Sequence, residues 1–295
     1  MGGGVSTPPP MRVDSTVPAG LPRGRRDGRI RPMKRVALLL ALAAVAAGCA
    51  TVPITGRRQL SLVSDSEILS SSLSQYRSYM GKAKVSGNKV QSAQVERVGR
   101  RIAAATERYL RENGLAKEVA NFAWEFNLVQ DKEVNAFCMP GGKIVVYTGL
   151  MALVASDDEL AVVLGHEVAH AVAKHANERM SQQLLAAAGA QAVGYATKER
   201  SAAVQSAAAG VYGIGAQVGA LLPFSRKHES EADYMGLALM TLAGYDPDCA
   251  PVFWRKMAAA GSGKTPELLS SHPSDASRVA ALEKALPEIK AKYKP

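Results

Sequence analysis

The amino-terminal part of this 295-residue chain lacks what a folded domain requires. Residues 1–32 are rich in Gly, Pro and Arg and have no apolar periodicity, so they cannot bury enough surface to fold. The apolar run that follows, residues 36–47, is too short to cross a bilayer as a stable helix. The sequence also shows no internal repeat. These absences exclude residues 1–32 from the folded domain and indicate a targeting segment at 36–47.

A basic stretch at 33–35 precedes the apolar run, and Gly48-Cys49 follows it, which is the layout of a signal peptide. The end of the run resembles a bacterial lipobox, which implies cleavage before Cys49 and diacylation of this residue. We therefore expect a signal peptide at 33–48, with translation starting at Met33. Residues 1–32 are then an untranslated, disordered extension. The mature protein is expected to be lipid-anchored in the bacterial envelope, facing the periplasm at the outer membrane. An uncleaved anchor is the alternative and leads to the same compartment.

The mature chain also lacks a strong charge imbalance. Residues 1–48 carry a net charge of +6 out of +10 for the whole chain, which leaves +4 on residues 49–295. A balance of this size gives no reason to expect nucleic acid as a partner. The 247 residues that remain suit one domain with a substantial core.

Cysteine is scarce, with three in the chain. With Cys49 assigned to the lipid, Cys138 and Cys249 remain. They could form a disulfide in an oxidising periplasm, or they could be two small buried apolar residues.

Apolar spacing and turn residues predict the order of the elements. Residues 49–64 are interpreted as a tether, and a single folded domain is expected over 65–290, beginning with helices within 65–114. Residues 122–130 alternate like a strand, and Pro140-Gly-Gly142 predicts a hairpin between strands at 134–139 and 143–147.

Helices are expected to dominate after the hairpin. Ser156 and Glu159 have the spacing of a capping box, and the helix that they open is predicted to run to about Met180. Residues 202–222 contain no charged side chain, so they form either a packed Ala/Gly-rich helix or hairpin, or a membrane span.

The middle of the predicted central helix reads Gly165-His-Glu-Val-Ala-His170. Positions i and i+4 face the same side of a helix, so His166 and His170 can bind one tetrahedral zinc ion. Glu167 lies beside them, where its carboxylate can accept a proton from water. The competing interpretation is a hydrogen-bonded pair of core histidines, but burying this set without a metal would be costly.

A catalytic zinc ion takes three protein ligands. Glu229 and Asp233 again stand at i and i+4, so one carboxylate can bind zinc while the other accepts a hydrogen bond from a ligand histidine. Glu231 lies about 200° around the helix from Glu229 and is not expected to reach the metal. His175 and His228 are interpreted as non-ligands.

Taken together, the motifs resemble the gluzincin peptidases that include HtpX, the mitochondrial Oma-type protease, the CAAX prenyl protease and periplasmic bacterial lipoproteins. The resemblance covers about residues 51–285 and is strongest to the Oma-like lipoprotein branch, because this chain lacks the several spans of HtpX-like members. It implies that Glu229 is the third ligand of one zinc ion per chain. Further stretches that carry it are Pro53-Ile-Thr-Gly56, Val134-Asn-Ala-Phe137, Pro140-Gly-Gly142, Tyr147-Thr-Gly-Leu150 and Gly244-Tyr-Asp-Pro247.

We therefore predict a zincin-like α+β domain, mainly helical with a small sheet, that acts as a zinc endopeptidase on protein or peptide substrates of the envelope, in protein quality control. Substrate is expected to add as a strand beside Lys143–Tyr147, at Ile144 and Val145. Asn135 either holds the substrate backbone or stabilises a turn. His272 either stabilises the oxyanion, blocks the open zinc position as a latch, or caps a surface helix.

Two other function classes fit the same residues. One is a zinc-stabilised chaperone or assembly factor with little proteolysis, and the other is a different zinc hydrolase such as an amidase. Replacement of Glu167 by Gln and a chelator-sensitive casein assay distinguish these from a peptidase.

Overall fold

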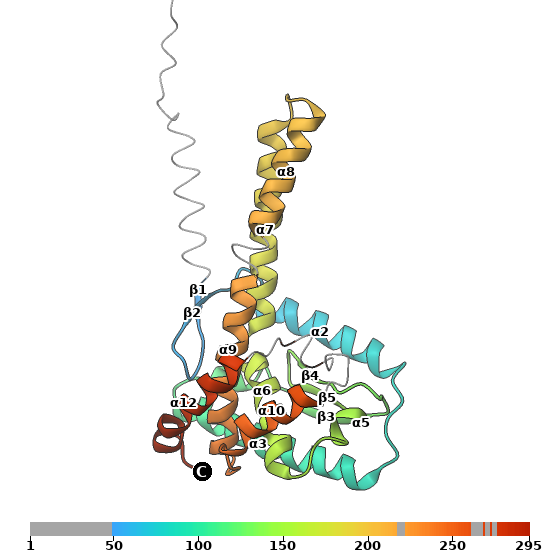
Figure 1. The fold of residues 1–295 in the computed structure, drawn as a ribbon, viewed down its shortest axis with the longest axis vertical. Helices are drawn as coiled ribbons and strands as arrows, with labels where there is room; N and C mark the ends of the chain where they lie inside the picture. The colour runs from blue at the N-terminus through green and yellow to red at the C-terminus, as the bar shows by residue number, and fades with distance from the viewer. Residues whose placement is uncertain (1–48, 217–221, 261–267, 269–271, 273–275) are drawn as a thin grey trace, which may run out of the picture. The chain divides into compact units, whose positions relative to one another are not determined.

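The computed structural model describes residues 49–216, 222–260, 268, 272 and 276–295 (Figure 1). The predicted extension at 1–32 and signal peptide at 33–48 lie outside the described residues. The strands are β1 (Cys49–Thr51), β2 (Arg58–Leu60), β3 (Glu125–Val129), β4 (Ala136–Met139) and β5 (Lys143–Tyr147). The helices are α2 (Asp65–Met80), α3 (Lys89–Glu112), α4 (Ala116–Val119), α5 (Thr148–Met151), α6 (Asp157–Val172), α7 (His175–Thr197), α8 (Ala202–Ala216), α9 (Leu222–Leu242), α10 (Cys249–Ala259) and α12 (Ala276–Lys292).

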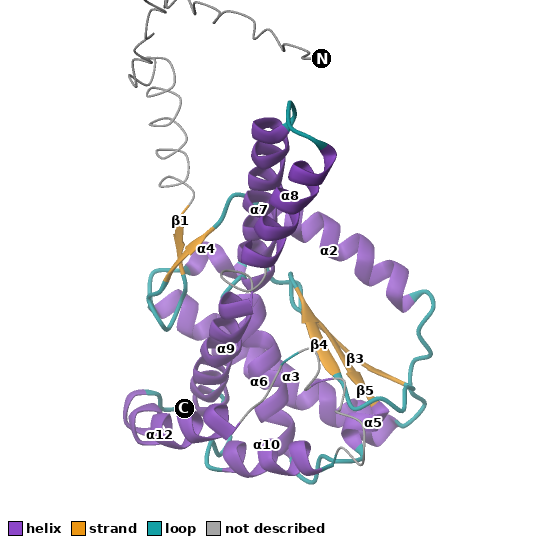
Figure 2. Cartoon of the chain, turned by 45° about the horizontal axis from the view of Figure 1, so that its top comes forward, coloured by secondary structure: helices purple, strands orange, loops and turns teal. Residues whose placement is uncertain are grey.

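A three-stranded sheet in the order β3-β5-β4 lies beside α3 and α6 (Figure 2). β5 pairs in parallel with β3 and antiparallel with β4, and the turn between β4 and β5 has positive φ at Gly141 and Gly142, as the sequence predicts. Successive residues of β5 face opposite ways. Ile144 packs in the main core with α3 and α6, and Val145 packs with Tyr76 of α2 on the other face.

The prediction that Lys143–Tyr147 offers an edge to substrate is wrong. β5 is the central strand of the sheet, with both of its edges paired. Ile144 and Val145 are fully buried and cannot touch a bound peptide. The prediction failed because β5 also pairs in parallel with β3. Local sequence does not predict this pairing, since no hairpin joins the two strands.

Helix α6 is buried on every side, as its apolar sequence predicts. Its amino terminus is capped by Ser156, whose side chain accepts from Glu159 N, although the Glu159 carboxylate reaches Ala155 N rather than Ser156 N. The prediction of one helix to Met180 is wrong. The helix ends at Val172, Lys174 adopts a left-handed conformation at φ 56°, and α7 starts at His175 in a new direction.

The helices α6 and α9 cross at two glycines. A Cβ atom on Gly165 would lie 2.8 Å from Gly236 O, and one on Gly236 would lie 2.9 Å from His166 N. Real side chains do not approach backbone this closely, so glycine at both positions allows the two metal-motif helices to touch.

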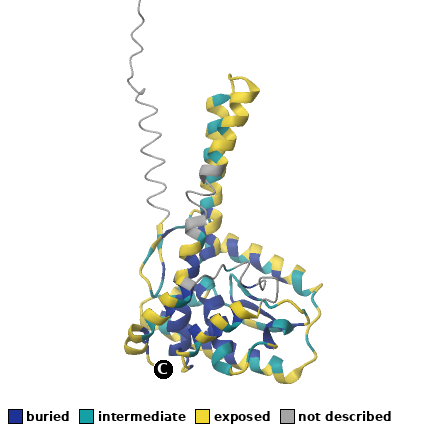
Figure 3. Ribbon diagram, in the orientation of Figure 1, coloured by how far each residue is buried: buried dark blue, intermediate teal, exposed yellow. Residues whose placement is uncertain are grey.

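The helices α7 and α8 form a hairpin that extends away from the sheet and carries mostly exposed residues (Figures 1 and 3). Tyr212 on α8 donates from its hydroxyl to Ala186 O on α7 at 3.0 Å. Two alternatives were considered for this segment, an Ala/Gly-rich helix or hairpin and a membrane span. For residues 202–216 the structure shows the Ala/Gly-rich hairpin. No described helix has both the length and the apolarity needed to cross a membrane.

The segment interpreted as a tether, 49–64, is instead part of the domain. Strands β1 and β2 pair with each other, Val52 and Gln59 are buried, and Gln59 Nε2 donates to Ala173 O at 2.8 Å. Cys138 and Cys249 are not joined in a disulfide.

Candidate metal centre and active site

Three of the predicted ligands meet where α6 and α9 cross. His166 Nε2 lies 3.1 Å from His170 Nε2 and 3.3 Å from Glu229 Oε2, and His170 Nε2 lies 3.7 Å from Glu229 Oε1. A tetrahedral zinc site with bonds of about 2.0–2.1 Å places its ligand atoms roughly 3.3 Å apart. These side chains are therefore spaced as the corners of a metal site.

His272 completes a group of four. Its Nδ1 lies 3.0 Å from Glu229 Oε2 and 3.4 Å from His166 Nε2, and the four ligand atoms all lie within 4.8 Å of one another. His272 thus reaches the cluster from a part of the chain far from α6 and α9. Of the three roles considered for it, the surface cap does not fit this position.

Two buried carboxylate oxygens point to a cation. Among the described residues, neither Glu229 Oε1 nor Glu167 Oε1 has a hydrogen-bond donor, although both atoms are buried. A buried anionic oxygen without a partner is costly. A divalent ion would satisfy the first, and a water molecule beside the ion would satisfy the second, so the residues fit a metal.

The protonation of the two glutamates differs. Burial alone would raise the pKa of Glu229, but the attraction of the neighbouring imidazoles of His166, His170 and His272 outweighs it and holds this pKa far below its ordinary value. Burial raises the pKa of Glu167, against the attraction of His272 and His166. Glu229 therefore stays ionised, and Glu167 is the carboxyl group suited to exchange a proton.

Asp233 lies where the sequence predicts a carboxylate that orients a ligand histidine. Its Oδ1 accepts from His166 Nδ1 at 3.1 Å. Arg278 on α12 donates to both oxygens of Asp233 at 2.7 Å, a bidentate pair that the sequence did not indicate.

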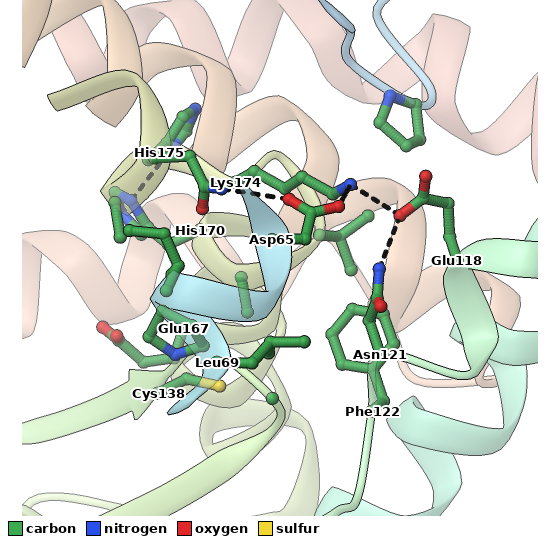
Figure 4. Close-up of a pocket in the computed structure, with 18 of the residues that line it drawn as sticks. Asp65, Leu69, Glu118, Asn121, Phe122, Cys138, Glu167, His170, Lys174 and His175 are labelled. Atoms are coloured by element: carbon green, nitrogen blue, oxygen red, sulfur yellow. Dashed lines mark hydrogen bonds and ion pairs between the residues drawn. The ribbon is translucent and has the colours of Figure 1, made fainter. Parts of the chain in front are cut away.

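His175 and His228 do not join the metal group, in agreement with their interpretation as non-ligands. His175 nevertheless contacts His170, with 2.8 Å between the two Nδ1 atoms (Figure 4). On a continuous helix the two rings would point about 140° apart. The break at Lys174 brings them together, so a broken helix hid this contact from sequence reasoning.

A pocket of about 190 Å³ opens beside Glu167 and His170 (Figure 4). Lys174 closes one end through ion pairs with Asp65 at 2.6 Å and Glu118 at 2.7 Å. The rest of the wall is mainly apolar and includes Ile68, Leu69, Phe122, Phe137 and Pro140. The pocket therefore offers apolar surface directly next to the candidate metal.

Asn135 has a local partner. Its Oδ1 accepts from Ala136 N at 2.9 Å, and its carbonyl accepts from Tyr147 N at 3.1 Å. Both contacts are local and are compatible with the turn-stabilising role considered for Asn135.

Comparison with known proteins agrees with the motifs. The model of Peptidase family M48 matches residues 90–286. The chain is 38% identical over 182 residues to the mitochondrial metalloendopeptidase OMA1 of Schizosaccharomyces pombe, covering 59% of this chain and 50% of that protein. It is 42% identical over 163 residues to its namesake in Arabidopsis thaliana, covering 55% and 32%. It is 34% identical over 161 residues to the beta-barrel assembly-enhancing protease of Yersinia pestis, covering 53% and 33%.

The chain thus spans half or less of the length of these relatives. The matched region contains α6, α9 and the segment that carries His272, which together form the candidate metal centre. The predicted resemblance and the mainly helical α+β, zincin-like fold are confirmed, and the chain belongs to Peptidase family M48.

Proposed function

We propose that this protein is a zinc-dependent endopeptidase in which His166, His170 and Glu229 hold the metal. The observation that carries the proposal is the meeting of these side chains at tetrahedral spacing, with Glu167 beside them, whose buried Oε1 has no hydrogen-bond donor among the described residues. When bound, zinc supplies Lewis acidity toward the scissile carbonyl and makes water easier to deprotonate.

Glu167 moves the proton. Its carboxylate accepts the proton of the attacking water and then delivers it to the leaving amine. Its raised pKa suits this exchange, because a carboxyl group that is too acidic would not hold the proton long enough to return it. Asp233 and Arg278 keep His166 in place during the reaction.

The substrate peptide is proposed to lie along β4. Within the described part of the chain β4 pairs only with β5, and its Cys138 lines the pocket together with Glu167. A peptide added there would have its backbone ordered by the strand and one side chain in the apolar pocket. Apolar side chains next to the cleaved bond should therefore be preferred.

His272 is proposed to act as a latch rather than as an oxyanion donor. Its Nδ1 faces the ligand atoms of Glu229 and His166, where the open coordination position would be. Leu268, in the same segment, donates from its backbone to Val134 O next to β4. Replacement of His272 by Ala should therefore raise peptidase activity; a fall would assign it to the oxyanion instead.

The deciding experiment for the proposed function is Glu167→Gln with casein as substrate. We expect casein cleavage to fall by at least about 100-fold while bound zinc, measured by elemental analysis, stays at one per chain. The matched control is Glu96→Gln, an exposed glutamate that pairs with Arg100 on the surface. Full biological function without cleavage in Glu167→Gln would favour the scaffold, and a wild type that leaves casein intact would favour another zinc hydrolase.

We further propose that the protein is lipid-anchored through Cys49 and acts on envelope polypeptides, including misfolded or unassembled ones. The signal-peptide layout before Cys49 supports the anchor, and similarity to the beta-barrel assembly-enhancing protease of Yersinia pestis supports an envelope setting. Cys49→Ser should move the protein from the membrane fraction to the soluble fraction, and unchanged fractionation would contradict the anchor.

A further inference from the structure

The two candidate zinc-binding histidines are each backed by a partner on the ring nitrogen that faces away from the metal. His166 Nδ1 is backed by the Asp233 carboxylate. His170 Nδ1 is backed by another imidazole, His175 Nδ1, at 2.8 Å. The usual partners of a ligand histidine are a carboxylate, a carbonyl or water, so the second arrangement needs an explanation.

The hydrogen bonds around His175 fix the position of each proton. Glu231 Oε2 lies 3.0 Å from His175 Nε2, and a carboxylate can only accept, so Nε2 of His175 carries a hydrogen. In a neutral imidazole the other nitrogen, Nδ1, is then an acceptor. His170 must therefore donate from its Nδ1, which leaves the lone pair of His170 Nε2 facing the metal group.

Glu231 is itself held by Arg57, from the connection between β1 and β2. Arg57 Nε donates to Glu231 Oε2 at 2.8 Å, and Thr55 Oγ1 donates to Glu231 Oε1 at 2.5 Å. Arg57 also donates through both terminal nitrogens to Glu178, at 2.9 and 2.7 Å. Both oxygens of Glu231 are thus occupied, and its orientation toward His175 is fixed.

The same cluster fixes the plane of the His175 ring. His228 stacks on it with 4.2 Å between ring centroids and 17° between planes, and His228 Nε2 lies 2.8 Å from Glu178 Oε2. All these residues except Arg57 and Thr55 are buried. A second metal site is not indicated, because the Arg57 guanidinium already lies between the two carboxylates where a cation would bind.

We propose that Arg57, Glu231 and His175 are positioning residues that hold His170 in the tautomer and orientation that zinc requires. The segment 49–60, interpreted from sequence as part of a tether, is on this account a component of the metal centre. The arrangement mirrors Arg278 and Asp233 behind His166. The inference rests on the proposed function only in that the cluster binds a metal.

The test measures zinc affinity, by competition with a chromophoric chelator, in the mature chain. His175→Leu removes the acceptor at similar volume and should weaken zinc binding by about 10–100-fold, the range found for the loss of such partners. His175→Asn keeps an oxygen at the place of Nδ1 and should recover most of this loss. Arg57→Ala should weaken binding less than His175→Leu, because it acts through Glu231.

The matched control is Arg97→Ala, which removes an arginine–carboxylate pair with Asp157 on the surface and should leave zinc affinity unchanged. The visible spectrum of the cobalt-substituted protein adds a readout of ligand geometry. The spectrum of His175→Leu should differ from that of the wild type, and the spectrum of His175→Asn should resemble that of the wild type. A purely structural role for His175 would not make the spectrum follow the acceptor.

The outcomes separate the two proposals. If the wild type fails to bind zinc, the proposed function falls. If the wild type binds zinc and folded His175→Leu binds it equally well, or His175→Asn binds no better than His175→Leu, the positioning role is wrong. Should His175→Leu fail to fold, the other two variants decide. Wild-type zinc affinity in His175→Asn would support the role of His175 as an acceptor. Wild-type zinc affinity in Arg57→Ala would overturn the proposed dependence on Arg57.

Discussion

The α6–α9 crossing and the α7–α8 hairpin are built from similar small residues but differ in what surrounds their glycines. At Gly165 and Gly236 a Cβ atom would meet the backbone of the other helix within 3 Å. At Gly194, Gly210 and Gly213 of the hairpin it would meet nothing within 4 Å. The crossing carries all three predicted ligands, His166, His170 and Glu229, whereas the hairpin is largely exposed (Figure 3).

The difference shows that a run of small residues has two distinct uses. At the crossing, close backbone approach brings Glu229 and Asp233 to the histidines of α6, and loss of that approach would cost the metal site. Among the hairpin glycines whose surroundings the structure describes, Gly189 is in close contact with Tyr212, whereas packing does not require glycine at Gly194, Gly210 or Gly213. The two regions should therefore respond very differently to the same perturbations.

Removal of the metal should have the largest effect, and it should act on the crossing. A ligand present at 1,000 times its Kd stabilises the folded state by about 4 kcal/mol. A chelator should therefore lower the melting temperature of the wild type, and hydrogen exchange should rise in α6 and α9 but not in α7 and α8. His166→Ala should show no further shift on chelation. Equal melting temperatures of wild type with and without chelator would contradict a structural contribution of the ion.

Gly236→Ala should have the next largest effect. Its Cβ would lie 2.9 Å from His166 N and 3.1 Å from Gly165 C, which are backbone atoms that cannot move without separating the helices. Overpacking of this kind costs about 1–3 kcal/mol, to be measured by urea unfolding. Zinc affinity should fall as well, because Glu229 and Asp233 move with α9. Unchanged stability together with unchanged zinc affinity would show that the crossing tolerates wider spacing.

The metal motif could be predicted from the sequence because it depends on local geometry. The spacing of His166 and His170, and of Glu229 and Asp233, determines which side chains share a helix face. The turn at Gly141 and Gly142 is local in the same sense. What these patterns required of the fold was only that two helices meet.

The errors concern contacts that no local pattern encodes. Lys174 is an ordinary helix former, yet it adopts a left-handed conformation, held by ion pairs to Asp65 and Glu118, and the helix breaks there. Arg57 is hydrogen-bonded to Glu178 and Glu231, which follow it in the sequence by 121 and 174 positions. The central place of β5 depends likewise on pairing with β3. Tertiary partners decided each of these features.

The metal-free protein should lose stability as the pH falls, and part of the loss should arise in the cluster behind His170. Burial lowers the pKa of His175 to about 4. The unfolded chain, with an ordinary histidine pKa near 6.5, then takes up the proton first, so stability falls between about pH 6.5 and 4. The slope contributed by one proton is at most about 1.4 kcal/mol per pH unit.

A second loss should follow at lower pH. Burial alone would raise the pKa of Glu178 and Glu231, but hydrogen bonds outweigh it and lower both pKa values to about 2. Glu178 accepts these hydrogen bonds from His228 and Arg57, and Glu231 accepts them from His175 and Arg57. Their contribution is present above the ordinary value of 4.5 and is lost between 4.5 and about 2. Urea unfolding at several pH values in a chelator measures both losses. His175→Asn should flatten only the upper part of the profile, and an unchanged profile would contradict the assignment.

Gly210→Ala should have the smallest effect and the opposite sign. The position is exposed on α8 and its Cβ would meet no atom within 4 Å, so the change adds no strain. Alanine favours a helix over glycine by up to about 1 kcal/mol, so local opening of the hairpin in hydrogen exchange should become slightly rarer. Zinc affinity and casein cleavage should stay at wild-type values, because the change touches neither α6 nor α9. A loss of activity in this variant would mean that the hairpin contacts the substrate or a partner through this face, and the separation between the two regions would then fail.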